Sequence, residues 1–78
     1  MVILAFNLSF EKAFSKIKDK SLKEKMIKQF VKIKGNPEIG KPMRYTRKGT
    51  REVYIPPFRL SYMYLAEENK IVILDFKR

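Results

Sequence analysis

The sequence predicts a two-layer α+β fold, in which two helices pack on one face of an antiparallel sheet. Three observations lead to this prediction. The chain opens with a β-branched and aromatic run, continues with two segments that have apolar residues at helical spacing, and ends with three strand-like runs separated by turn signals. At 78 residues it can bury one modest core but not two, so we expect a single domain over residues 1–78.

The first strand is predicted at Val2 to Phe6, and it would be buried on both faces if it lies inside the sheet. Ser9 is a candidate N-cap for a short first helix, because its side chain can accept a hydrogen bond from a free N–H group at the helix start. Phe10, Phe14 and Ile17 then recur at helical spacing and define the side of this helix that we expect to be covered.

A second helix is predicted from Ser21, which forms a capping-box pattern with Glu24, to about Lys34. Gly35 supplies the stop, and an irregular connection follows. The opposite side of the helix carries lysines, for which a solvated face and a contact with an RNA backbone both remain open. One apolar stripe is expected to pack on the sheet, and it consists of Leu22, Met26, Phe30 and Ile33.

The C-terminal part of the chain is predicted to form an antiparallel meander of three strands, REVYI, RLSYMYL and IVILDFKR. Pro56-Pro57 separates the first two strands, and a two-residue loop at Glu68-Asn69 would join the last two. That register places Arg59 opposite Arg78, although a slip of one residue would change the pairing. Because directly opposed cations are unfavourable in a sheet, the arrangement suggests that an anion binds between them.

The composition is strongly basic, with 18 lysines and arginines against 8 acidic residues and a net charge of +10. Such a charge favours a polyanionic partner, either a nucleic acid or an acidic protein, although lysine-rich surfaces also arise from genome composition or growth at high temperature. The absence of histidine and cysteine excludes Ser-His and Cys-His nucleophiles, zinc sites and disulfides. We therefore expect no metal and no cofactor, and the lack of a long apolar run predicts a soluble cytoplasmic protein without a membrane partner.

Arginine suits the cleavage of RNA, whose 2′-hydroxyl can attack the adjacent phosphate once the strand is held in line. The guanidinium group donates two parallel hydrogen bonds to phosphate oxygens and stays charged at any working pH. For the proton transfers the candidates are Glu52, Tyr54 and a lysine whose pKa is lowered by cationic neighbours. Lys48 is the preferred lysine, because three arginines crowd it in sequence, namely Arg44, Arg47 and Arg51.

The aromatic residues of the meander have both a functional and a structural interpretation. Tyr54 and Phe58, with Tyr45 before them, could stack on exposed bases. Tyr62 and Tyr64 alternate with apolar neighbours and are predicted to pack in the core or across strands. Arg59 likewise has a structural alternative, a surface ion pair with Asp75 or Glu52 that would contribute little energy.

Three short motifs occur in order along the C-terminal half. They are Arg47-Lys48-Gly49 before the meander, Phe58-Arg59-Leu60-Ser61-Tyr62 in its middle strand, and Phe76-Lys77-Arg78 at its end. In this order and spacing the chain resembles the RelE toxins of toxin–antitoxin systems, within the RelE/ParE superfold. The plan of strand, two helices and meander matches that family over the whole chain.

The resemblance implies a ribosome-dependent endoribonuclease, an mRNA interferase that cuts mRNA in the decoding site and so inhibits translation. It implies that Arg59 and Arg78 orient and neutralise the phosphate, with Arg51 and Lys48 sharing the catalytic work. Residues that we expect to bind RNA are Arg44, Arg47, Tyr54, Phe58 and Lys77.

The same resemblance implies a cognate partner, a small acidic RelB-like antitoxin, in a complex that is heterotetrameric or larger. Two other functions remain open. ParE relatives share the fold, inhibit DNA gyrase and do not cut RNA, and a catalytically silent RNA-binding homologue would keep the fold without the activity.

Overall fold

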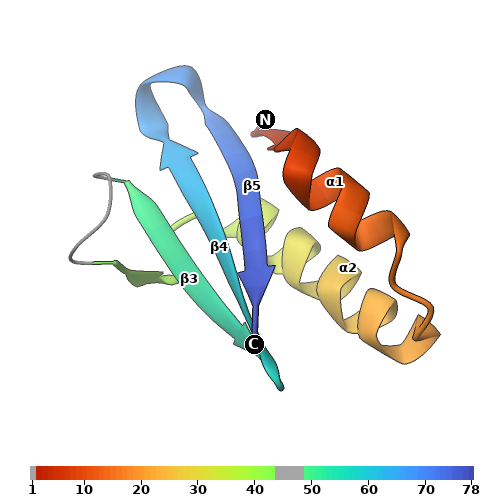
Figure 1. Ribbon diagram of the computed structural model, residues 1–78. Coiled ribbons are helices and arrows are strands. Elements are labelled where there is room, and N and C mark those ends of the chain that lie inside the picture. The colour runs from red at the N-terminus through yellow and green to blue at the C-terminus, as the bar shows by residue number, and fades with distance from the viewer. Residues whose placement is uncertain (1, 44–48) are drawn as a thin grey trace.

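The structure of the protein, a computed structural model, describes residues 2–43 and 49–78 (Figure 1). Its elements are β1 (Ile3–Phe6), α1 (Leu8–Ser15), α2 (Lys20–Gly35), β2 (Lys41–Pro42), β3 (Thr50–Ile55), β4 (Phe58–Leu65) and β5 (Lys70–Lys77), with a 3-10 helix at Ala66–Glu68 between β4 and β5. The predicted order of strand, two helices and antiparallel meander is confirmed, and the fold is α+β. The sequence does not predict β2, which lies where an irregular connection is expected.

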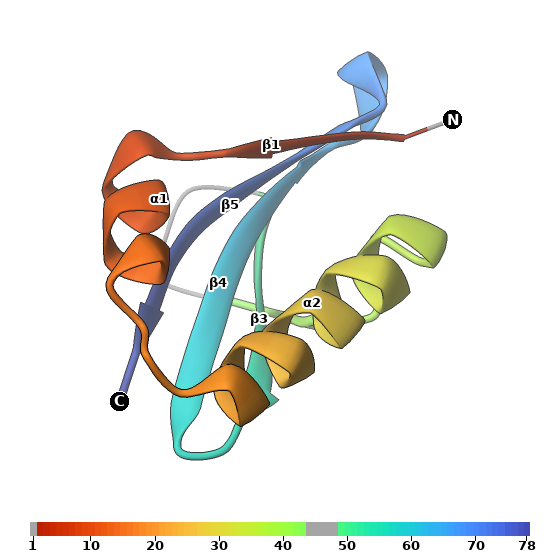
Figure 2. The same cartoon turned by 90° about the vertical axis from the view of Figure 1, so that its right-hand side faces the viewer.

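The five strands form one sheet in the order β1-β5-β4-β3-β2. β1 runs parallel to β5, and the remaining neighbours are antiparallel. β1 is therefore an edge strand and does not lie inside the sheet, so the condition for burial on both of its faces is not met, and Ile3 is 60% exposed. Both helices lie on one side of the sheet (Figures 1 and 2), and no described helix covers the other side.

The core lies between the helices and the covered face of the sheet. The predicted stripe on α2 is confirmed, since Met26, Phe30 and Ile33 are buried and Leu22 packs beside them. From α1, the ring of Phe10 is 2% exposed and lies 5.9 Å from that of Phe30 in edge geometry. The strands complete the core with Ile55, Leu60, Tyr62, Ile71 and Ile73.

Both helices begin two residues earlier than predicted, because the residue just before each one supplies the cap. Asn7 Oδ1 accepts a hydrogen bond from Ser9 N at 2.8 Å, and Asp19 Oδ1 accepts one from Leu22 N at 3.2 Å. Asn and Asp cap at least as well as Ser. The predicted N-caps at Ser9 and Ser21 are therefore wrong, and α2 begins at Lys20, one residue before Ser21. Within the described part of the chain, neither helix has the length and apolarity needed to cross a membrane.

The register of the last hairpin differs from the prediction. Leu65 pairs with Lys70, and the chain turns through the 3-10 helix and Asn69, whose φ of 51° is left-handed, instead of a two-residue loop. A second irregularity lies farther along, because Ser61 pairs with Asp75 but Tyr62 pairs with Ile73. Together the two features place Lys77, and not Arg78, opposite Arg59.

Tyr62 ties the loop after α2 to the covered face of the sheet. Its side chain is fully buried, its hydroxyl donates to Pro37 O at 2.7 Å, and it accepts from Gly40 N at 2.9 Å. Arg51 lies opposite Tyr62 on β3, and its Nη1 donates to Gly40 O at 2.8 Å and to Glu38 O at 3.1 Å. These hydrogen bonds pair backbone groups of Pro37, Glu38 and Gly40, and Gly40 is buried, where an unpaired polar group would be costly.

We expect an alkaline loss of stability that is specific to Tyr62. Burial raises the pKa of Tyr62 above its ordinary value of 10.0, although the Gly40 hydrogen bond and the Arg51 charge oppose this rise. Above about pH 10 the unfolded chain therefore releases a proton that the folded chain retains, so the free energy of unfolding falls as pH rises. The free energy of unfolding, measured with urea between pH 8 and about pH 11, should fall more steeply with pH for the parent than for Tyr62→Phe. Parallel curves would contradict this assignment.

Candidate functional site

The uncovered face of the sheet carries a row of aromatic and cationic side chains across three strands. The register pairs Tyr54 on β3 with Arg59 on β4, and Arg59 with Lys77 on β5. Since successive residues of a strand point to opposite faces, these three side chains lie opposite to the buried neighbours Leu60 and Ile55. Two like charges thus face each other across strands, as the sequence suggests, but the partner is Lys77.

The next row on the same face is acidic and polar. Glu52 pairs with Ser61, and Ser61 pairs with Asp75. Ser61 Oγ donates to Asp75 O at 3.3 Å, and Asp75 Oδ1 accepts from Phe76 N at 2.8 Å. The site therefore holds two carboxylates immediately beside its two facing cations.

These two rows form the wall of a hollow with a volume of about 290 Å³. It is lined by Met43, Glu52, Arg59, Ser61, Asp75, Lys77 and Arg78, and we call it the outer-face hollow. Three positive side chains and two negative ones line it, so its net charge favours an anion. Within it, Lys77 Nζ lies 3.6 Å from Asp75 Oδ2, with the two side chains 82% and 45% exposed, and such an exposed ion pair contributes little.

Arg59 forms no ion pair among the residues that the structure describes, so the alternative of a surface pair with Asp75 or Glu52 is not observed there. Its side chain is exposed and faces another cation. A bound phosphate would relieve the repulsion between Arg59 and Lys77 and accept the two parallel hydrogen bonds of the guanidinium group. Glu52 likewise has no ion-pair partner in the described part of the chain.

The predicted site residues are divided between several places. Arg59, Arg78 and Lys77 come together in the outer-face hollow, and Tyr54, 64% exposed, lies beside Arg59. Phe58 is on the covered face, where its ring packs edge-on against that of Phe76 at 5.4 Å. Arg44, Arg47 and Lys48 lie outside the described residues.

Arg51 is not part of the outer-face hollow. It shares the covered face with Val53 and Ile55, and its guanidinium group binds backbone carbonyls of the loop after α2. The structure therefore places Arg51 and Arg59 on opposite faces of the sheet. The sequence contained a signal for this, because residues two apart in a strand point to the same face, and Arg51 is two residues from Val53 and four from Ile55. By the same alternation Ser61, two residues from Arg59, could have been added to the site. Asp75 could not, because it alternates in step with the buried Ile73 and reaches the outer face only through the irregularity near Ser61.

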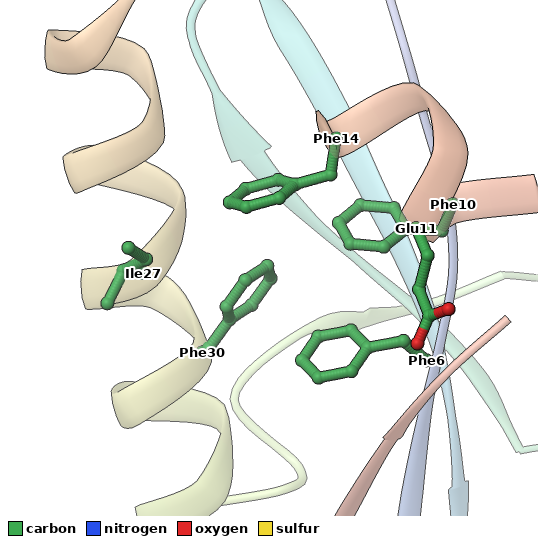
Figure 3. Close-up of a pocket in the computed structure, with 6 residues that line it drawn as sticks. All are labelled: Phe6, Phe10, Glu11, Phe14, Ile27 and Phe30. Atoms are coloured by element: carbon green, nitrogen blue, oxygen red, sulfur yellow. The ribbon is translucent and has the colours of Figure 1, made fainter. Parts of the chain in front are cut away.

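A second hollow, between the helices, is apolar (Figure 3). Its volume is about 280 Å³, and it is lined by Phe6, Phe10, Glu11, Phe14, Ile27 and Phe30. Figure 3 shows the four phenylalanine rings between α1 and α2. Its lining has one carboxylate, that of Glu11, among apolar side chains, so this hollow can bind an apolar group but has no set of side chains suited to catalysis. Among the described residues no group of three potential metal-ligating side chains occurs.

Comparison with known protein families bears on what this arrangement does. The sequence model of a family described as "ParE toxin of type II toxin-antitoxin system, parDE" matches residues 4–78. The chain belongs to the RelE/ParE superfamily. It is accordingly a toxin of a type II toxin–antitoxin system. No curated protein matches its sequence significantly.

Solved structures of RelE/ParE toxins show the same fold at low identity. The chain is similar to the toxin in the intact E. coli RelBE complex, with a TM-score of 0.86, 16% identity and coverage of 100% of this chain and 96% of that one. For RelBE2 of Mycobacterium tuberculosis the TM-score is 0.80 and the identity 22%, over 99% and 96% of the two chains. For the heterotetrameric YoeB-YefM complex of Staphylococcus aureus the TM-score is 0.74 and the identity 21%, over 100% of this chain and 97% of that one. At these identities the likeness establishes the fold alone.

Proposed function

We propose that this toxin is a ribosome-dependent mRNA endoribonuclease that acts in the cytoplasm, where ribosomes translate. The observation that carries the proposal is the pair of facing cations, Arg59 and Lys77, in an outer-face hollow that also holds Arg78 and two carboxylates. Opposed cations are a structural cost in a sheet, and an anion bound between them offsets that cost. A phosphate of a single RNA strand is such an anion.

The reaction needs positioning more than it needs a nucleophile from the protein. The 2′-oxygen of a nucleotide attacks the adjacent phosphorus, and the bond from phosphorus to the 5′-oxygen breaks, which leaves a 2′,3′-cyclic phosphate and a 5′-hydroxyl end. Arg59 would hold two phosphate oxygens through its fork, and Arg78 and Lys77 would stabilise the charge that builds on the pentacoordinate phosphorus. Tyr54 would stack on a neighbouring base.

Two proton transfers accompany this displacement. Glu52 lines the hollow beside Arg59 and would accept the proton of the 2′-hydroxyl. The leaving 5′-oxygen needs a proton, for which Lys77 within the hollow and Lys48 outside the described residues are the candidates. Arg51 would act as a positioning residue, because it fixes the loop that leads into β2 and so the wall of the hollow at Met43.

The partner that silences the toxin would be a small acidic RelB-like antitoxin in a complex of heterotetrameric or larger size. A net charge of +10 attracts an acidic chain, and exposed apolar residues offer it surface to cover. Several of them are on β1 and the helices, namely Ile3, Leu8, Ile27 and Val31. Ile73 of the last hairpin, by contrast, is buried and offers no such surface. Carboxylates of the partner would lie near Arg59 and Arg78.

The test of the proposal is cleavage of mRNA on programmed ribosomes by the isolated toxin. Cleavage in the decoding site, absent when ribosomes are omitted, is the expected result. A second function, inhibition of DNA gyrase, is favoured by one finding, the match to a family described as ParE toxins, so a supercoiling assay with gyrase is run on the same preparation. Inhibition of supercoiling without RNA cleavage would replace the proposal, and ribosome binding without cleavage would indicate a silent homologue.

The salt dependence of binding separates an RNA target from a protein target. If contacts with phosphates dominate, the affinity for programmed ribosomes should fall by about 0.7 log units per log unit of salt for each single-strand contact. Three cations line the outer-face hollow, so we expect a combined slope of roughly two. Equilibrium binding over a range of KCl concentrations gives this slope. A flat dependence would contradict binding through phosphates and point to a protein surface.

A further inference from the structure

Another polar hollow adjoins the outer-face hollow at the C-terminal end of β5. Its volume is about 450 Å³, and its walls are the first turns of α2, the Pro56-Pro57 turn between β3 and β4, and Arg78. Figure 2 shows that turn beside the start of α2. We call it the turn hollow. Arg78 lines both hollows, so a single extended strand that occupies one can continue past Arg78 into the other.

The turn hollow combines three kinds of surface. Pro57, Phe58 and Leu22 provide an apolar floor, Lys25 and Arg78 provide positive charge, and Asp19 provides a carboxylate. Asp19 Oδ1 already accepts the hydrogen bond from Leu22 N that caps α2, so the helix start itself is not the binding group.

This combination fits a nucleotide better than a bare phosphate. A base is flat and apolar on its faces and carries N–H donors on its edge, which suit the apolar floor and the carboxylate of Asp19. The phosphate linked to it would lie against Lys25 and Arg78. The volume is within the range of small-ligand sites. A free anion, by contrast, gains nothing from the apolar floor and is repelled by the carboxylate.

We infer that the turn hollow binds the nucleotide next to the one whose phosphate occupies the outer-face hollow. The inference rests on the proposed RNA substrate and adds to it a subsite that selects and aligns the flanking base. Alignment at this position favours attack in line, because holding the strand on both sides of the reacting phosphate restricts its rotation.

The first experiment maps contacts by photo-crosslinking. Ribosomes are programmed with an mRNA that is 2′-O-methylated at the scissile nucleotide to prevent cleavage and that carries 4-thiouridine at one flanking position at a time. We expect one flanking position to crosslink to peptides that contain Pro57 and Phe58 or the start of α2. If both flanking positions crosslink only to the outer face of the sheet, the inference is overturned while the proposed function stands.

The second experiment uses two variants with the same change of charge. Lys25 lines the turn hollow and Lys28, one turn farther along α2, does not; both are exposed. Lys25→Glu should lower kcat/KM for mRNA cleavage about tenfold more than Lys28→Glu, mainly through KM, as expected for loss of a charge-assisted contact with bound RNA. Equal effects of the two variants would overturn the inference. Failure of the parent to cleave would instead overturn the proposed function, and this inference with it.

Discussion

Replacing Arg59 by Ala is expected to lower the rate of mRNA cleavage on programmed ribosomes by about a hundredfold or more, because one charged donor to the transition state is lost. The melting temperature should stay the same or rise slightly, since Arg59 is exposed and faces Lys77 in the register. Arg59→Lys should restore only part of the rate, because an ammonium group cannot reproduce the bidentate fork. Single-turnover cleavage and thermal melting are measured on each variant.

Arg51→Ala is the matched control, because it removes the same side chain from the neighbouring strand on the opposite face of the sheet. Its loss breaks the hydrogen bonds to Glu38 O and Gly40 O, which should lower the free energy of unfolding by about 1–3 kcal/mol. Arg59→Ala should therefore lower the rate without loss of stability, whereas Arg51→Ala should lower the stability and reduce the rate only through the displaced wall of the hollow. If Arg59→Ala cleaves as well as the parent, or melts much lower, Arg59 is a structural cation.

Gly40→Ala is expected to destabilise the protein by about 2–4 kcal/mol, through steric overlap and lost hydrogen bonds together. A Cβ at this position would lie 2.6 Å from the hydroxyl oxygen of Tyr62 and 2.8 Å from its ring. Tyr62 is fully buried and paired with Pro37, so it cannot move aside without losing its partners. For a domain of this size each 1 kcal/mol corresponds to roughly 4–8 °C in melting temperature.

Gly35→Ala serves as the control for this substitution. Gly35 is the last residue of α2, and a Cβ there would meet no atom within 4 Å. Because alanine favours the helix and restricts the unfolded chain, this variant should be as stable as the parent or more stable, by up to about 1 kcal/mol. Thermal and urea unfolding of the pair give the comparison. Equal losses in both variants would mean that the contact between Gly40 and Tyr62 does not hold the loop in place.

Membership of the RelE/ParE superfamily establishes the fold, whereas the choice of target depends on the local chemistry of the site. The fold is shared by toxins with different targets, so it cannot decide between RNA and gyrase. The outer-face hollow, where Arg59 faces Lys77 beside Glu52 and Arg78, favours the RNA target that we propose.

The sequence by itself determined the class of fold, the order of the main elements and the apolar stripe of α2. These features depend on local periodicity, and residues such as Met26, Phe30 and Ile33 must be buried on one side in any packing of that helix. The positive charge of the last strands could likewise be predicted, because it follows from their amino-acid composition alone. The meander followed from turn residues such as Pro56-Pro57.

Only the tertiary structure decided which charged groups meet. The register of β4 against β5 depends on the 3-10 connection and on the irregularity near Ser61, and a shift of one residue exchanges Arg78 for Lys77 opposite Arg59. Arg51 finds its carbonyl partners on the covered face because the loop after α2 packs there. Arg78 lines two hollows because the start of α2 lies close to the Pro56-Pro57 turn. Such contacts join residues distant in sequence, so their geometry follows from the packing of the whole domain and not from any local pattern.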